Sequence, residues 1–199
     1  MPPARTTYHH GNLREALLEC AEQMLERTGV GEVSLREVAR QTGVSHGAPR
    51  RHFPDKQALL DALAENGFER LGRELDAVVQ EVNGPFTARL TAFARAWVNF
   101  ASRHPALLDM MFASKNQPQA DSLRRAADRA FAASSAMICE AQARHDIVDR
   151  DNDQAATAIL ATIQGLTALI VSGMLPDRRP DDLIADTIET LVDGLRPRS

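Results

Sequence analysis

The feature that most constrains this chain is a pair of short helical segments joined by a tight turn, close to the N-terminus. Ser34 and Glu37 have the spacing of a capping box, in which the two side chains satisfy free N–H groups at the start of a helix. Gly43 supplies the left-handed residue that ends such a helix, and Ser45 can begin another that runs to about Phe53. The spacing therefore predicts a helix-turn-helix.

Apolar residues recur at helical spacing along the rest of the chain, and Gly or Pro interrupts them between segments. Ala and Leu are abundant and aromatic residues make up only 5%, a composition that favours helices. No stretch has the alternation of a strand. We therefore expect an all-α fold of about nine helices, at residues 13–28, 34–42, 45–53, 55–82, 86–104, 107–112, 123–138, 154–172 and 181–195.

Charge is divided unevenly along the chain. The net charge is −4, but residues 1–60 hold 8 Lys and Arg against 7 Asp and Glu, a balance of +1, which leaves −5 for residues 61–199. If residues 1–60 bind a polyanion, the acidic residues 61–199 can face away from it. Residues 1–12 are polar, unlike a secretory signal, and no stretch approaches the roughly 18 apolar residues of a membrane span. We expect a cytoplasmic protein with no membrane partner.

The second helix of a helix-turn-helix enters the major groove of DNA, with its N-terminal residues at the base edges. Arginine is well suited to that position because it can bind O6 and N7 of guanine together. Lys56 and the helix start beside it suit a backbone phosphate, since helix N-termini attract anions. The expected contacts with double-stranded DNA are Ser34, Arg36, Ser45, His46, Gly47, Arg50, Arg51, His52 and Lys56.

Two other classes of function compete with DNA binding. A helical partner-binding protein could use the helix-turn-helix only as a scaffold, but a scaffold has no need for the dense Arg, His and Ser residues of 45–52. A helical enzyme should carry an acid and a base together, and the chain has no such pair, no Gly-rich phosphate loop and no nucleophile elbow. The adjacent His9 and His10 point apart on a helix. We therefore expect no catalytic residue, cofactor or metal.

The larger, C-terminal part is where a small effector would bind. Large apolar residues from three helical segments could surround a mostly apolar cavity, and methionines adapt to ligands of varied shape. The same residues could equally be ordinary core. The candidate pocket residues are Trp97, Phe100, Met110, Met111, Phe131, Met137 and Gln164.

The last two helices are candidates for a homodimer interface. The helix at 154–172 is apolar or small almost all round, so it must be covered on several sides, and the helix at 181–195 has an apolar stripe. A monomer core is the alternative. The candidate interface residues are Ala158, Ala161, Gly165, Leu169, Ile184, Ile188 and Leu191.

The N-terminal motif resembles the TetR family of regulators. The matching runs are Val33-Ser34-Leu35-Arg36-Glu37-Val38-Ala39, Thr42-Gly43-Val44-Ser45 and Arg51-His52-Phe53-Pro54-Asp55-Lys56-Gln57-Ala58-Leu59-Leu60. The resemblance implies a DNA-binding domain at 8–65 and a ligand-binding and dimerisation domain at 66–199. It also implies a dimer on a palindromic operator, acting as a repressor that a small, largely apolar effector relieves.

A second resemblance extends into the C-terminal part, and one position departs from the family. Ala96-Trp97-Val98-Asn99-Phe100-Ala101, His104-Pro105-Ala106-Leu107, Met110-Met111-Phe112 and Gln164-Gly165-Leu166 resemble one C-terminal subtype. Family members usually place a phosphate-binding Tyr before Arg-His-Phe, and here that position is Arg50. The family's contact is therefore not transferred to Arg50, which could bind phosphate or read a base.

Overall fold

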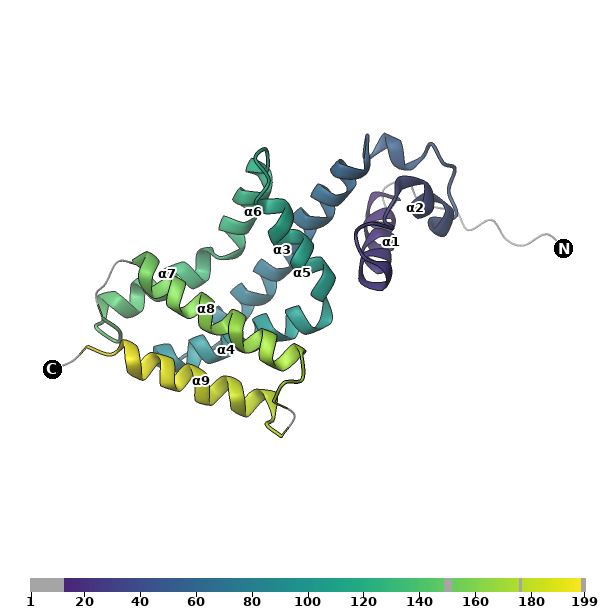
Figure 1. Cartoon of the computed structure of the whole chain (residues 1–199). Helices are drawn as coiled ribbons and strands as arrows, with labels where there is room; N and C mark the ends of the chain where they lie inside the picture. The colour runs from purple at the N-terminus through teal and green to yellow at the C-terminus, as the bar shows by residue number, and fades with distance from the viewer. Residues whose placement is uncertain (1–12, 149–151, 176, 198–199) are drawn as a thin grey trace. The chain divides into compact units, whose positions relative to one another are not determined.

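A computed structural model describes residues 13–148, 152–175 and 177–197, and it is all-helical over these residues, as predicted (Figure 1). They form nine α-helices and one short 3₁₀ helix, with no strand among them. The elements are α1 (Leu13–Thr28), α2 (Leu35–Thr42), η1 (Pro49–Arg51), α3 (Lys56–Glu81), α4 (Phe86–Arg103), α5 (Pro105–Lys115), α6 (Asp121–Ala130), α7 (Ala132–Ala143), α8 (Asn152–Val171) and α9 (Pro180–Leu195).

The number of α-helices agrees with the prediction, although two segments differ from it. The segment expected as a helix from Ser45 to Phe53 contains only the 3₁₀ helix η1. Pro49 has no N–H to donate to the Ser45 carbonyl, so the segment forms bonds three residues apart, from Ala48 N to Ser45 O (2.9 Å) and from His52 N to Pro49 O (2.9 Å).

The helix expected over 123–138 is divided into α6 and α7 at Phe131. No Gly or Pro marks this break in the sequence. The break places the Phe131 ring beside the Trp97 ring of α4, with the ring centroids 5.7 Å apart. Packing between helices therefore decides a boundary that local sequence does not signal.

Helix α2 begins and ends at the residues that the sequence indicates. Ser34 is extended (φ −146°, ψ 147°), and its hydroxyl accepts from the Glu37 N–H at 3.2 Å. The Glu37 carboxylate accepts from Arg40 and Gln41 and not from the Ser34 N–H, so only half of the expected capping box forms. At the other end Gly43 is left-handed (φ 73°), and the Val44 N–H donates to Ala39 O at 3.0 Å.

The chain divides into two compact units. The first holds the chain up to Gly67 together with Pro105–Leu123, and the second holds Phe68–His104 and the chain from Arg124 on. The first unit thus ends near the expected boundary at residue 65, but it also takes in α5, which the sequence analysis placed in the second domain. The Glu26 carboxylate of α1 explains this, because it accepts from the free N–H groups of Ala106 (3.2 Å) and Leu107 (3.0 Å).

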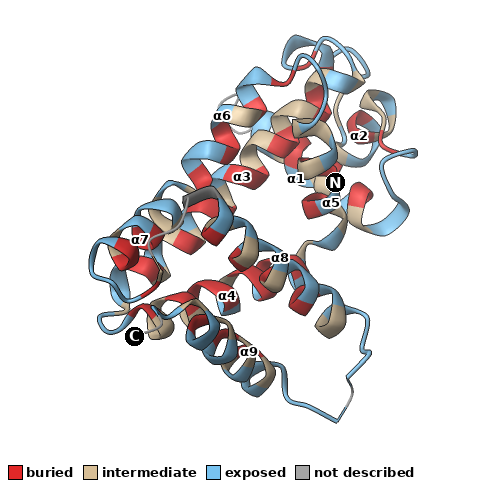
Figure 2. Cartoon of the chain, turned by 60° about the vertical axis from the view of Figure 1, so that its left-hand side comes forward, coloured by how far each residue is buried: buried red, intermediate tan, exposed pale blue. Residues whose placement is uncertain are grey.

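The second unit is a helical bundle with α4 at its centre. Helices α7, α8 and α9 each pack against α4, and the Arg89 guanidinium of α4 donates to the Glu140 carboxylate of α7 at 2.7 Å. The buried faces of these helices are red in Figure 2. Core side chains exposed by 6% or less include Leu90, Phe93, Trp97, Phe100, Ile138, Ile159, Ile163, Ile184 and Ile188.

Helix α8 contradicts the expectation that no stretch approaches the length and apolarity of a membrane span. Its 18 residues Gln154–Val171 are long and apolar enough to cross a membrane by length and composition, although no such stretch was expected. Only 28% of them are buried in the protomer. Core helices of soluble proteins pass the same test, so length and composition do not decide between lipid and protein as the cover of this helix.

We expect Ser34→Ala to destabilise the first unit. The change leaves the Glu37 N–H without its acceptor, and losing a serine N-cap costs about 0.5–2 kcal/mol of unfolding free energy. Denaturant titration measures the loss. Ser34→Asp should restore most of it, and Ser135→Ala, on an exposed residue of α7, is the control. An unchanged midpoint in Ser34→Ala would contradict the capping role.

Candidate nucleic-acid interface

The turn after α2 and the helix η1 form an exposed polar face. Two residues of the same segment anchor it in the core: Pro49 is buried, and Phe53 is only 2% exposed. The Phe53 N–H donates to Pro49 O at 2.8 Å, which fixes the end of the segment. The exposed residues are Ser45, His46, Gly47, Arg50, Arg51 and His52, and Arg36 of α2 is exposed as well.

Several arginines of the first unit are already engaged within the protein. Arg14 lies over the Phe53 ring at 5.6 Å, Arg27 donates to the Gln41 side chain at 3.5 Å, and Arg40 pairs with Glu37. By contrast, Arg36, Arg50 and Arg51 have no ion-pair partner within the described part of the chain. Their guanidinium groups are therefore available to phosphates or base edges.

The structure gives Lys56 a role inside the protein. Its ammonium donates to the carbonyl oxygens of Val30 (2.9 Å) and Gly31 (3.0 Å), in the loop between α1 and α2. Because an ammonium has three donors, one remains for a phosphate. The Asp55 carboxylate caps α3, accepting from the Ala58 N–H at 2.8 Å. The interpretation of Lys56 as a free phosphate ligand is thus revised: it first holds the loop that leads into α2.

The predicted effector residues are divided between the two units. Met110 and Met111 belong to the first unit and the others to the second. The side chains of Trp97, Phe100, Met111 and Met137 are at most 1% exposed. Gln164 is exposed. Core packing therefore accounts for most of this set.

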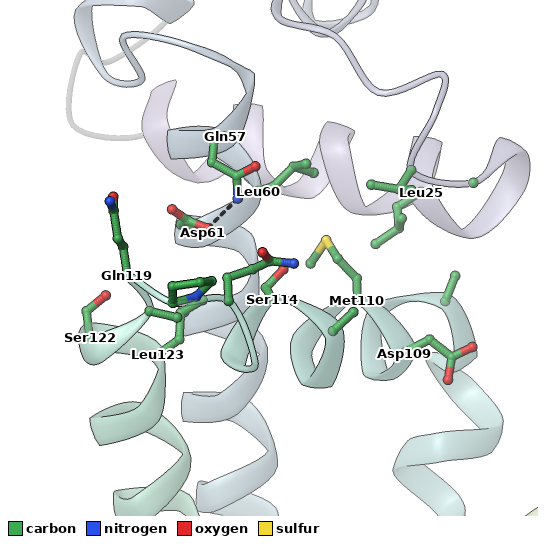
Figure 3. A pocket seen from close by; sticks show the side chains of 17 residues that line it. Leu25, Gln57, Leu60, Asp61, Asp109, Met110, Ser114, Gln119, Ser122 and Leu123 are labelled. Carbon is green, nitrogen blue, oxygen red and sulfur yellow. Dashed lines mark hydrogen bonds between the residues drawn. The ribbon is translucent and has the colours of Figure 1, made fainter.

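A cavity of about 780 Å³ does lie in the first unit, where the sequence analysis expected none (Figure 3). Of the predicted effector residues, only Met110 lines it. Its walls come from α1, α3, α5 and the start of α6, four segments with no shared motif. Sequence spacing carries no signal for such a cavity, because the segments meet only in the fold.

The predicted dimer residues are divided between surface and core. Ala161 and Gly165 of α8 are exposed, and Ala158, Leu169 and Leu191 are half-buried. Ile184 and Ile188 are 2% and 0% exposed within the protomer, so their expected place in an interface is wrong. The apolar stripe of α9 that suggested it packs against α4 and α8 of the same chain.

The capped helix α2, the glycine turn and an exposed arginine face on η1 define a helix-turn-helix DNA-binding protein. Residues 17–63 match the family model described as "Bacterial regulatory proteins, tetR family", and residues 90–195 match "Tetracyclin repressor-like, C-terminal domain". The chain belongs to the TetR family and is a DNA-binding transcriptional regulator. The family resemblance and the functional class predicted from the sequence are thereby confirmed.

Relatives extend over most of the chain. A solved structure of a protein of unknown function from Rhodococcus sp. RHA1 is 41% identical, with 97% of this chain and 100% of that chain covered and a TM-score of 0.89. The nucleoid occlusion factor SlmA of Pectobacterium carotovorum is 26% identical, over 80% of this chain and 83% of its own. FadR from Bacillus subtilis, solved with stearoyl-CoA, shares the fold at 16% identity, a TM-score of 0.70, and 92% and 99% coverage.

We expect Glu37 to make the free energy of unfolding depend on pH in the acid range. Hydrogen bonds from Arg40, and then from Gln41, lower the pKa of Glu37 from its ordinary 4.5 to about 2. A lowered pKa means that the folded state favours the ionised carboxylate, so this stabilisation is complete above 4.5 and disappears as the pH falls towards 2.

Glu37→Gln should therefore unfold more easily than the wild type at neutral pH. The difference in unfolding free energy between the two proteins should shrink as the pH falls from 4.5 towards 2. Denaturant midpoints measured across pH test this. Glu19→Gln, on an exposed glutamate of α1, is the control. A constant difference between wild type and Glu37→Gln down to the lowest pH would contradict the assignment.

Proposed function

We propose that this regulator is a homodimeric repressor of the cytoplasm, which binds a palindromic operator through two helix-turn-helix heads and releases it when a small effector binds. The observation that carries the proposal is the exposure of Arg50 and Arg51 on η1 and of Arg36 on α2, whose charges the described residues do not neutralise. An exposed, uncompensated group of guanidinium donors suits a polyanion. Pro49 and Phe53, on either side of Arg50 and Arg51 in the chain, are buried and anchor the segment that carries them.

The face divides into two kinds of contact. We expect Arg51 and the turn residues Ser45 and His46 to meet base edges, and we expect the third N–H of Lys56 and the N-terminus of α2 to meet phosphates. Arg50 stands where the family usually has a phosphate-binding tyrosine, and its longer, charged side chain can serve either purpose. Selection of binding sites from random duplex DNA with the purified protein tests the proposal directly. Failure to enrich any sequence would favour a partner-binding protein in which the motif is only a scaffold.

We expect Arg51→Ala to weaken DNA binding in a way that identifies its contact. Loss of a guanine contact should cost about 1–3 kcal/mol and relax the preference at one base pair, whereas loss of a phosphate contact should weaken all sequences and lower the salt slope by about one. Binding isotherms on the selected operator at several salt concentrations distinguish the two. Arg125→Ala, on an exposed arginine of α6, is the control; equal affinities for both variants and wild type would refute the interface.

Helix α8 supports the proposed dimer. One face, with Ile159 and Ile163, is buried in the protomer, while the opposite face is exposed and either small or apolar. Leu160 is 47% exposed and Val171 is 50% exposed, large values for apolar side chains. A second copy of the same helix is the cover that the family fold favours. The exposed residues of this face are Thr157, Leu160, Ala161, Gln164, Gly165, Ala168 and Val171.

We expect Gly165→Leu to dissociate the dimer without unfolding the protomer. A Cβ at Gly165 would meet no atom within 4 Å inside the protomer, so we expect the protomer to accept a side chain there and the proposed partner to be obstructed by it. Light scattering should move towards the protomer mass of 21.8 kDa, and operator affinity should fall because one head makes half the phosphate contacts.

Ala77→Leu, on an exposed residue of α3, is the matched control and should remain dimeric. A wild-type particle of protomer mass that still binds a palindrome tightly would overturn the dimer. Two heads should also require half-sites about one DNA turn apart, ~34–36 Å, or a multiple of it.

We propose that the effector binds in the second unit. Because Trp97, Phe100 and Met137 are buried and Trp97 packs against Phe131, a ligand of the second unit would have to separate these side chains. Stearoyl-CoA, bound by FadR of Bacillus subtilis, illustrates a large, partly apolar effector on this fold. Calorimetric titration with candidate effectors, followed by operator release, tests this part independently of DNA recognition.

A further inference from the structure

The cavity of the first unit has the size of a small-molecule site. Its volume of about 780 Å³ lies within the roughly 300–1,000 Å³ common for ligand pockets. Helix α1 contributes its last turn and the loop beyond it, α3 its first two turns, and α5 one long face. The Glu26 carboxylate holds the N-terminus of α5 on α1, so two of the walls are fixed to each other. The cavity is therefore part of the unit's architecture.

The charges of the lining select the ligand. Among the 17 residues around the cavity there is no Lys, Arg or His, and the two carboxylates are those of Asp61 and of Asp109, which is exposed. Asp61 is half-buried, and one of its oxygens accepts from the Gln57 amide at 2.8 Å. A buried or half-buried anion is stabilised by a positive partner. This lining disfavours ligands with phosphate or carboxylate groups and favours a cation.

Polar and apolar side chains line the cavity together. In Figure 3 the Gln57 amide, the Asp61 carboxylate and the Gln119 amide lie towards one end, with Leu60 and Leu123 near them, and Leu25 and Met110 lie towards the other, on the side of the Asp109 carboxylate. An occupant of the whole cavity would therefore meet both carboxylates and apolar side chains. We propose that this cavity binds an organic cation with an apolar body, the positive charge beside Asp61 and the apolar part against Leu25 and Met110.

This site is directly connected to the helix-turn-helix. Val30 lines the cavity with 46% of its surface exposed, and its carbonyl accepts one of the two Lys56 hydrogen bonds that hold the loop before α2. Gln57, the residue after Lys56, lines the cavity as well. A ligand that presses on Val30 and Gln57 therefore acts on both sides of the Lys56 contact. This regulatory consequence rests on the proposed DNA-binding function; the binding of the cation does not.

The first test uses two probes of the same shape and opposite charge, tetraphenylphosphonium and tetraphenylborate. Each is titrated into the full chain by calorimetry without DNA. We expect the phosphonium to bind at least tenfold more tightly than the borate. Absence of phosphonium binding, or equal or tighter binding of the borate, overturns the proposal.

The second test removes the charge and keeps the shape. Asp61→Asn should weaken phosphonium binding about tenfold, because it deletes the nearest carboxylate, and leave borate binding unchanged or stronger. Asp128→Asn, on an exposed residue of α6 outside the cavity, is the matched control and should bind as the wild type does. Equal phosphonium affinity in Asp61→Asn and the wild type overturns the site. Unfolding midpoints of both variants exclude a loss of folding as the cause.

The third measurement separates the site from the function. Ala113→Trp places an indole at the wall of the cavity and should abolish phosphonium binding in a folded protein. If the wild type binds phosphonium but selects no DNA, the cavity assignment stands and the proposed DNA-binding function fails. If an operator is found, saturating phosphonium should change operator affinity in the wild type and not in Ala113→Trp; the same change in both proteins overturns the regulatory connection.

Discussion

Burial of Phe53 under the helix-turn-helix is the interaction on which the DNA-binding face depends. A 3₁₀ segment as short as η1 has little stability of its own, and its exposed residues bring no apolar contacts. The Phe53 side chain, 2% exposed, anchors the end of the segment, and its N–H bonds to Pro49 O. Arg14 covers the ring from α1. The exposed arginines are thus presented from a rigid base, which limits the conformational entropy lost on binding DNA.

In the first unit, charged side chains also connect backbone segments through hydrogen bonds. Lys56 holds the loop before α2 through two carbonyl oxygens, and Glu26 holds the N-terminus of α5 through two N–H groups. Both connect segments that are far apart in the sequence and that line the same cavity. A ligand in the cavity and DNA at Lys56 would therefore both act on the Lys56 contact, as coupling between two sites requires.

The second unit shows how one apolar pattern can serve two purposes. Helices α8 and α9 both carry apolar stripes, and the sequence analysis assigned both to a dimer interface. In the fold, Ile184 and Ile188 of α9 are used within the protomer, whereas α8 leaves Leu160 and Val171 about half exposed. Periodicity indicates that a face is covered, but it does not say by which chain, because a core and an interface bury the same side chains.

The sequence by itself determined the features that depend on neighbouring residues: the cap at Ser34, the left-handed end at Gly43 and the all-helical fold that spacing dictates. Tertiary structure decided the rest. It divided α6 from α7 at Phe131, used Lys56 on the Val30 carbonyl, and assembled a cavity from four separate segments. The physical reason is the distance along the sequence over which each kind of interaction acts. Caps and helical periods involve bonds across three or four residues, whereas packing and cavities depend on which distant surfaces meet, and local spacing does not encode that.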